Sequence, residues 1–274
     1  MNDKKLDQFY TKKEISKMIM NEINKNFEIK NYFLVEPSAG TGSFSNLFHS
    51  NSQSFDIDPK NENIIKKDFL QIKKQDLNNR NKEIFTIGNP PFGKNSSTAL
   101  KFVNKSAEFS KYIGFILPKT FKKQSIINRI NKNLHLIMEY EIPEKSFIFK
   151  EKEYSVPCIF QIWEKKESIR ETKATIRQSD FFDFVKKENA DFAIRRVGGL
   201  AGKVIIDFSL YKPSSHYYIS ILQKENKEKI IKTITDNFEE LNKISRNAAG
   251  NPSLSKIELI SIVEIKLKKA INVL

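Results

Sequence analysis

The sequence predicts an α/β fold, in which short buried strands alternate with helices around a central sheet. The apolar residues 32–35 lead directly into a turn that contains Gly40 and Gly42, a pattern typical of a strand, a tight turn and a helix. A second apolar run, residues 83–88, ends in Asn-Pro-Pro-Phe. Acidic side chains follow several of the predicted strands, and ligands of open α/β sheets bind at that edge.

Seven segments are predicted to form the strands of this sheet. They are residues 32–35, 53–59, 64–70, 83–88, 112–118, 134–140 and 157–163. Helices are predicted over 96–109 and 123–132, with another that begins at Glu14 and one that follows the glycine-rich turn. The expected arrangement is therefore a sheet with helices packed against it.

The tetrapeptide after residues 83–88 combines an amide, two prolines and an aromatic ring: Asn89, Pro90, Pro91 and Phe92. An exocyclic purine amine is a poor nucleophile, because its lone pair is delocalised into the ring. The Asn89 side-chain oxygen and the Pro90 carbonyl could accept its N–H groups and hold it in line with an electrophilic methyl group. Prolines fix φ, and Phe92 offers a π face for an unstacked base. The alternative is a plain strand-to-loop turn.

Acids at three strand ends indicate a ligand at the same edge. Glu36 suits a cationic or amine-bearing group, and Asp56 lies where a ribose diol could bind. Asp68 could accept a hydrogen bond from an adenine amine, with Phe69 packed nearby. Each acid alone could be an ordinary solvated loop residue. The glycine spacing is not that of a dinucleotide site and no Walker lysine follows, so a pyrophosphate ligand is disfavoured.

In their order along the chain, these motifs resemble those of the S-adenosylmethionine-dependent adenine-N6 DNA methyltransferases of the amino-methyltransferase group. The resemblance covers residues 1–165. It implies a Rossmann-like class I methyltransferase core with a seven-stranded mixed sheet, S-adenosyl-L-methionine as the cofactor, and no metal. It also implies that the methyl group passes by direct displacement to N6 of an adenine flipped out of DNA.

The resemblance further assigns roles to individual residues. The cofactor-binding residues would be Gln8, Phe9, Tyr10, Thr11, Glu36, Pro37, Ala39, Gly40, Gly42, Asp56, Ile57, Asp68, Phe69 and Asn89. The catalytic residues would be Asn89, Pro90, Pro91 and Phe92, of which Phe92 would also contact the substrate. In this family an aromatic residue of the hairpin before the last strand sandwiches the target base, and Phe147 is expected in that role ahead of Phe149. Alternatively, both rings belong to the core.

Lys119 and Lys122 are the expected phosphate contacts of the first 165 residues. They follow the fifth predicted strand at the same edge as Asn89, so contact with the backbone of a nucleic acid is geometrically reasonable.

A second, smaller α+β region is predicted at residues 174–274, because a charged run from Glu164 ends the apolar pattern. Its predicted elements are strands around a glycine-rich turn in 192–208, a strand at 215–219, a helix over 229–244 and a last helix opened by serine caps at 253–256. By the resemblance, this region carries target recognition. Its substrate-binding residues would be Arg195, Arg196, Lys203 and Arg246. The alternative is an appendage that only completes the core.

The composition limits the partners and the compartment. The net charge of +14 would attract a polyanion, although lysine, asparagine and isoleucine are abundant throughout the chain. No apolar run is long enough to span a membrane and the start lacks a signal peptide's apolar segment, so we expect an intracellular, cytoplasmic protein. Cys158 is the only cysteine, which excludes an internal disulfide, and the three histidines lack the spacing of metal ligands.

Other functions remain open on the sequence alone. The same amine chemistry would serve an RNA adenine methyltransferase, and a very similar tetrapeptide occurs in protein glutamine methyltransferases. A catalytically silent subunit could keep the fold and only bind nucleic acid. DNA is the expected partner, with RNA as the alternative, and a restriction subunit or a second methyltransferase subunit could also bind. The sequence reveals neither the recognised bases nor the oligomeric state.

Overall fold

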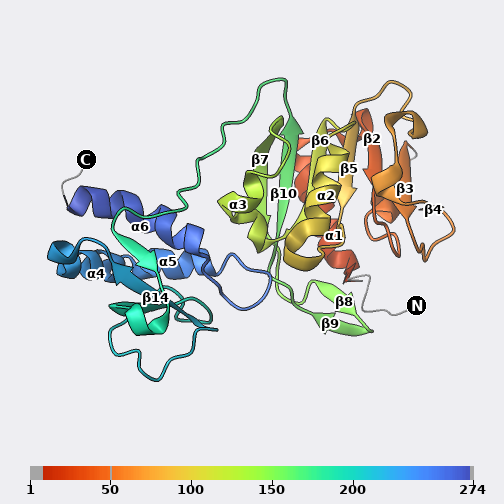
Figure 1. Ribbon diagram of the computed structural model, residues 1–274. Helices are drawn as coiled ribbons and strands as arrows, with labels where there is room; N and C mark the ends of the chain where they lie inside the picture. The colour runs from red at the N-terminus through yellow and green to blue at the C-terminus, as the bar shows by residue number, and fades with distance from the viewer. Residues whose placement is uncertain (1–8, 50, 272–274) are drawn as a thin grey trace. The chain divides into compact units, whose positions relative to one another are not determined.

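The computed structural model describes residues 9–49 and 51–271. The chain forms two compact units, one up to Thr172 and one from Lys173 (Figure 1). Each unit has its own hydrophobic core. The sequence predicts the boundary between residues 165 and 174, and the two units divide at Thr172 and Lys173.

A mixed seven-stranded sheet forms the centre of the first unit (Figure 1). In spatial order its strands are β4 (Ile65–Lys66), β3 (Ser52–Asp56), β2 (Phe33–Glu36), β5 (Ile84–Gly88), β6 (Tyr112–Pro118), β10 (Cys158–Lys165) and β7 (Leu134–Glu141). The first five are parallel, and β10 is antiparallel to both of its neighbours. The order reverses at β2, which lies between β3 and β5. This is the Rossmann-like class I methyltransferase fold expected from the sequence.

Burial explains why the central segments are strands. Every residue of β2 and β5 is buried, as expected for parallel strands covered on both faces, and such strands are continuous apolar runs. The edge strand β7 instead mixes buried and exposed side chains. All seven predicted strands are present, although β4 is only two residues long.

The helices of the first unit differ more from the expectation. They are α1 (Lys13–Asn26), α2 (Ser97–Ser106) and the single turn α3 (Gln124–Ile127). The prediction of a helix after the glycine-rich turn is wrong, because only the 3-10 turn η3 (Ser45–Leu47) forms there. Few residues separate this turn from β3, and serine and asparagine favour turns over helix interiors. The other 3-10 turns of the chain are η2 (Ile29–Asn31), η4 (Phe69–Gln71), η5 (Lys74–Asp76), η6 (Lys94–Ser96), η7 (Lys119–Lys122), η8 (Lys187–Asn189) and η9 (Lys224–Asn226).

A small antiparallel sheet joins the start of the described chain to a distant hairpin. Its strands are β1 (Tyr10–Thr11), β8 (Phe147–Phe149) and β9 (Lys152–Tyr154), in the order β1-β8-β9. Tyr10 pairs with Ile148, and the Lys12 N–H donates to the Ser146 carbonyl at 3.1 Å. The sequence did not predict β1 as a strand. Its pairing brings the N-terminal motif beside the hairpin.

The second unit packs three helices against a four-stranded antiparallel sheet. The strands, in spatial order, are β11 (Phe182–Phe184), β14 (His216–Ile221), β12 (Phe192–Arg195) and β13 (Val204–Ile205), and the helices are α4 (Lys227–Asp236), α5 (Phe238–Ser245) and α6 (Lys256–Ala270). The single helix predicted over 229–244 is in fact α4 and α5. The helix is interrupted at Asn237, whose side-chain amide donates to the Thr233 carbonyl at 2.7 Å. The predicted serine cap of α6 is confirmed, because Ser255 and Glu258 form a capping box.

Within residues 9–49 and 51–271, no helix is long and apolar enough to cross a membrane. The same residues bring together no group of three histidine, cysteine, aspartate or glutamate side chains that could hold a metal ion. Cys158 is fully buried in β10, and this burial raises the pKa of its thiol.

Gly114→Ala tests the packing of the central sheet. A Cβ at this position in β6 would lie 2.9 Å from Phe160 Cζ and 3.3 Å from Phe85 Cε2, and both rings are fully buried. We expect the free energy of unfolding to fall by about 1–3 kcal/mol, because a close-packed core cannot yield to an added methyl group. Urea unfolding measures the loss. Gly250→Ala is the control, because no atom lies within 4 Å of its added Cβ. Equal midpoints for the two variants would contradict this account of the packing.

Candidate active site

A pocket of about 360 Å³ opens at the carboxyl ends of β2, β3 and β5, where the strand order reverses. Most of the cofactor-binding and catalytic residues expected from the sequence line it. They are Phe9, Tyr10, Thr11, Glu36, Pro37, Ala39, Gly40, Asp56, Ile57, Asp68, Phe69, Asn89, Pro90, Pro91 and Phe92. Gly42 does not line the pocket, and Gln8 lies outside the described residues.

Two carboxylates hold the glycine-rich turn that forms one wall. Glu36, at the end of β2, accepts the Ser45 N–H at 2.7 Å. Asp56, at the end of β3, accepts the Gly40 N–H at 2.7 Å through Oδ2. Gly40 and Gly42 both have positive φ, and the Gly42 N–H donates to the Ala39 carbonyl at 2.6 Å. Gly42 therefore shapes the turn without facing the pocket.

Glu36 is the most strongly perturbed acid of the site. It is 2% exposed, and burial raises its pKa to about 8, although hydrogen bonds from the backbone of Ser45 and Phe44 oppose the shift. Near neutral pH the folded protein therefore keeps Glu36 largely protonated. A cation bound in the pocket would favour the carboxylate form instead.

The loop after β3 places a second acid, Asp58, at the pocket. Asp56 accepts the Asp58 N–H at 2.8 Å through Oδ1, so both of its oxygens already hold backbone groups. Asp58 lines the pocket, is exposed and pairs with Lys60 at 2.5 Å. Ile57, between them, is 50% exposed. The signal that indicated Asp56, an acid at a strand end, applies equally to Asp58.

The amide of Asn89 is oriented by the N-terminal strand. Its Nδ2 donates to the Phe9 carbonyl at 3.0 Å, and its backbone carbonyl accepts the Ser38 hydroxyl at 3.0 Å. Its Oδ1 is buried and has no hydrogen-bond partner within the described part of the chain. Buried polar atoms are normally paired, so this free acceptor requires an explanation. Asn89 lines the pocket, although its Oδ1 itself is buried.

Aromatic rings cluster beside the Asn89 tetrapeptide. The Phe92 and Phe9 rings are stacked, with centroids 6.5 Å apart and an interplanar angle of 27°. Phe9 in turn contacts Phe149 and Tyr154, each at 5.1 Å. The hairpin rings therefore reach Phe92 through Phe9.

Phe147, expected to sandwich the target base, is fully buried in the core, so its ring presents no exposed face in this structure. Phe149 points to the same side of β8, since residues two apart in a strand do so. The two rings differ in their position along the strand, because Phe149 lies at the end that contacts Phe9.

Several pocket residues were not predicted. They are Ser38, Ser43, Leu70, Gly93, Thr98 and Phe102. Gly93 directly follows the tetrapeptide and has φ of +69°, and a Cβ there would lie 2.1 Å from Thr98 Oγ1. The glycine after Asn-Pro-Pro-Phe was therefore a usable signal. Thr98 and Phe102 lie on α2, and nothing in their local sequence marks them.

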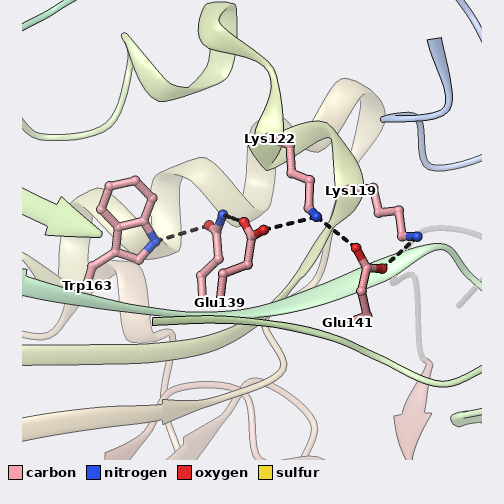
Figure 2. Close-up of polar contacts among 6 residues, drawn as sticks. Lys119, Lys122, Glu139, Glu141 and Trp163 are labelled. Atoms are coloured by element: carbon pink, nitrogen blue, oxygen red, sulfur yellow. Dashed lines mark hydrogen bonds and ion pairs between the residues drawn. The ribbon is translucent and has the colours of Figure 1, made fainter. Parts of the chain in front are cut away.

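Lys119 and Lys122 are already paired with carboxylates (Figure 2). Glu141 lies 2.7 Å from both ammonium groups, and Glu139 lies 3.0 Å from Lys122. Although burial lowers it, the pKa of Lys122 is raised overall by hydrogen bonds to Glu141 and Glu139. Gln161 extends the chain of contacts, because its amide donates to Glu139 at 2.8 Å and accepts the indole N–H of Trp163 at 3.1 Å. A phosphate at this position would have to replace Glu141.

The four basic residues predicted in the second unit lie near one another, around the turn between β12 and β13. The Arg195 N–H donates to the Lys203 carbonyl at 2.9 Å, and the Arg196 carbonyl accepts the Leu254 N–H at 2.8 Å. Arg246 reaches the same turn through Asn242.

Comparison with known proteins supports the same class of domain. A family model described as the EDM2 methyltransferase-like domain matches residues 45–177, which include Asp56, Asp68 and the Asn89 tetrapeptide. This part of the chain is therefore similar to a methyltransferase-like domain. No curated protein sequence matches it.

Solved structures with similar folds come from several organisms. One from Pyrococcus horikoshii, provisionally described as an RNA methyltransferase, has 14% identity and a TM-score of 0.45 over 60% of this chain and 90% of its own. A modification subunit from Vibrio vulnificus YJ016, assigned provisionally to a type I restriction enzyme, has 15% identity and a TM-score of 0.42. The match covers 58% of this chain and 44% of that subunit. A Thermoplasma acidophilum protein has 18% identity and a TM-score of 0.41, and the match covers 60% of this chain and 93% of that protein. At these scores the fold assignment rests on the strand order described above.

Glu36→Gln tests the buried acid through the pH dependence of stability. Because the pKa is raised to about 8, the folded state keeps a proton that the unfolded state releases above its ordinary value of 4.5. Stability from this group is therefore full below that value and is lost as the pH rises towards 8, with a slope of at most about 1.4 kcal/mol per pH unit.

The glutamine variant lacks this titration and still offers an acceptor to the Ser45 N–H. We expect its free energy of unfolding, measured in urea from pH 5 to 8, to fall less with pH than that of the wild type. A constant difference between the two proteins over this range would show that Glu36 is ionised in the fold.

Proposed function

We propose that this protein transfers the methyl group of S-adenosyl-L-methionine to N6 of adenine in DNA. The observation that carries the proposal is the buried Oδ1 of Asn89, a pocket residue, because this atom has no hydrogen-bond partner among residues 9–49 and 51–271. An adenine amine has two N–H groups and needs acceptors that localise its lone pair. Asn89 is held in the orientation that presents an acceptor, because its Nδ2 is fixed by the Phe9 carbonyl.

The pocket residues fit the proposed cofactor. Gly40 lets the turn pack closely against the Tyr10 ring of the pocket, because a Cβ there would lie 2.8 Å from that ring. Glu36 and the exposed Asp58 supply negative charge for an ammonium group and acceptors for hydroxyl groups. Ile57 and Phe69 supply apolar surface for an adenine ring. When bound, the cofactor supplies an electrophilic methyl group for direct displacement.

The protein's own contribution is to position the target amine. The Asn89 Oδ1 and the Pro90 carbonyl accept its two N–H groups, and Phe92, which is 8% exposed, stacks on the base. Phe149 replaces Phe147 as the hairpin aromatic that contacts the base. The resemblance of the tetrapeptide and of the motif order favours DNA over RNA or protein. We further propose that the second unit carries target recognition and that Arg195, Arg196, Lys203 and Arg246 contact DNA there, whereas Lys119 and Lys122 contact a phosphate after exchange with Glu141.

Asn89→Ala tests the catalytic assignment. The variant removes one acceptor for the amine, so we expect methyl transfer to fall by about 100-fold or more, the range found when one preorganised catalytic hydrogen bond is lost. The cofactor dissociation constant should change by less than about threefold, since the lost interaction belongs to the transition state. Labelled methyl transfer and calorimetric cofactor titration measure the two quantities. Asn189→Ala is the control, because Asn189 is exposed on the second unit. Undiminished transfer by the Asn89 variant would refute the assignment.

The substrate class is tested by offering labelled S-adenosyl-L-methionine with separate pools of DNA, RNA and protein. We expect label in DNA, recovered as N6-methyladenine and absent with the Asn89 variant. Label in RNA or in a glutamine side chain would move the function to that class. Cofactor binding without transfer to any pool would indicate a silent subunit or a missing partner.

Phe149→Ala tests the reassigned aromatic. Base stacking on an aromatic ring contributes about 1–3 kcal/mol, so we expect KM for DNA to rise about tenfold with little change in folding stability. Phe147→Ala should instead lower the free energy of unfolding by about 3–5 kcal/mol, as for other buried phenylalanines. Steady-state kinetics and urea unfolding separate the two effects. An unchanged KM for the Phe149 variant would remove it from the substrate site.

A further inference from the structure

The turn between β12 and β13, residues 198–203, is a tight, glycine-rich loop that packs on α5 and exposes Gly199 and Leu200. It closes on itself through hydrogen bonds from the Ala201 N–H to the Gly198 carbonyl at 2.9 Å and from the Gly202 N–H to the Arg195 carbonyl at 2.7 Å. Gly198 and Gly202 have φ of +93° and +102°. Leu200, at its tip, is 47% exposed.

Asn242 on α5 fixes this turn from behind. Its Nδ2 donates to the Gly199 carbonyl at 2.8 Å and to the Ala201 carbonyl at 3.0 Å, and its Oδ1 accepts Arg246 Nε at 3.2 Å. Gly202 packs so closely on α5 that a Cβ there would lie 2.7 Å from Leu241 Cβ. The conformation of the turn is therefore set by the helix, and the carbonyls of its exposed part point towards the protein.

The N–H groups of the tip remain available. Those of Gly199 and Leu200 donate to no other atom in the described part of the chain. No heavy atom lies within 4 Å of a Cβ built on Gly199, so a ligand can approach the backbone there. Consecutive backbone N–H groups in a turn form an anion-binding concavity.

Basic residues flank the turn in the sequence, and the Arg195 side chain lies beside Gly198. Among the described residues, none of Arg195, Arg196, Lys203 and Arg246 forms an ion pair, in contrast to Lys119 and Lys122 of the first unit. Arg195 Nη2 would lie 3.5 Å from a Cβ on Gly198, and Lys203 is exposed. Arg196 lies over the Tyr217 ring at 5.1 Å with its Nε buried and unpartnered. An anion that binds Arg195 or Lys203 would therefore not have to displace a paired carboxylate.

We propose that the turn at residues 198–203 binds a DNA backbone phosphate, through the N–H groups of Gly199 and Leu200 and the side chains of Arg195 and Lys203, with Asn242 as the positioning residue. The proposal rests on the proposed function for its choice of DNA. Phosphate contacts of this kind fix the register of a protein on the duplex without reading bases.

The first experiment measures the salt dependence of binding of the full chain to a fluorescein-labelled DNA duplex by anisotropy. Each phosphate contact adds about 0.9 to the slope of log affinity against log salt, so Lys203→Ala should lower the slope by about 1. Lys269→Ala is the matched control, because Lys269 is exposed in the last turn of α6 and forms no ion pair with a described residue. Equal slopes for the two variants would overturn the proposal.

A second pair of variants tests the backbone donors. Leu200→Pro removes one N–H, whereas Leu200→Ala keeps it and removes the side chain. We expect the proline variant to bind DNA about tenfold more weakly than the alanine variant, the loss of one hydrogen bond to a charged acceptor. Equal affinities would overturn the backbone contact. Thermal unfolding of each variant confirms that the second unit is intact.

Asn242→Ala tests the positioning role. Releasing the turn should weaken DNA binding and lower its salt slope while leaving cofactor binding unchanged, because Asn242 belongs to the second unit. A variant that loses stability but keeps the wild-type slope would show a purely structural role.

The outcomes separate this proposal from the proposed function. If the wild type methylates DNA and the turn variants bind DNA normally, the proposed phosphate site is refuted and the proposed function is supported. If the variants change the salt slope and the wild type methylates no DNA, the function fails and the site stands. A labelled RNA duplex is measured in parallel, and a slope change with RNA but not with DNA would overturn the choice of DNA.

Discussion

The two carboxylates that end β2 and β3 are the interaction on which the site depends. Glu36 and Asp56 accept backbone N–H groups from the glycine-rich turn at 2.7 Å each, so the turn is held from two neighbouring strands. Backbone hydrogen bonds support the same turn, from the Ala39 N–H to the Phe55 carbonyl at 3.0 Å and from the Lys60 N–H to the Gly40 carbonyl at 3.0 Å. Holding the backbone in this way requires acids close to one another, and burial raises the pKa of Glu36. A bound cation would favour the carboxylate form of Glu36, so the same acids suit the pocket to a cationic ligand.

The strand β1 connects this pocket to the amine site. Phe9, Tyr10 and Thr11 line the pocket, the Phe9 carbonyl orients Asn89, and β1 pairs with β8 of the aromatic hairpin. The segment of residues 9–11, which includes β1, therefore contacts the proposed cofactor site, the Asn89 amide and the Phe149 ring. Residues 9–11 therefore contribute side chains to the pocket wall and a main-chain carbonyl to the orientation of Asn89.

Ion pairing separates the basic residues into two groups. Lys119 and Lys122 belong to a chain of contacts with Glu139 and Glu141, which neutralises them in the free protein. The basic residues around the turn at 198–203 have no such partners in the described part of the chain. Net charge alone does not reveal this difference, because a sequence shows the number of charges and not their neighbours. The unpaired charges are the ones that release counterions on binding a polyanion.

By itself, the sequence determined the central sheet and most of the pocket. Buried parallel strands are continuous apolar runs, and side chains at their carboxyl ends must meet at one edge, so the strands and Asp56, Asp68 and Asn89 were predictable. Tertiary structure alone decided which ring is buried and how Asn89 is oriented. Phe147 and Phe149 have the same local pattern, and the Phe9 carbonyl lies far from Asn89 in the sequence. Such contacts depend on which distant segments pack together, and the local sequence pattern does not predict that packing.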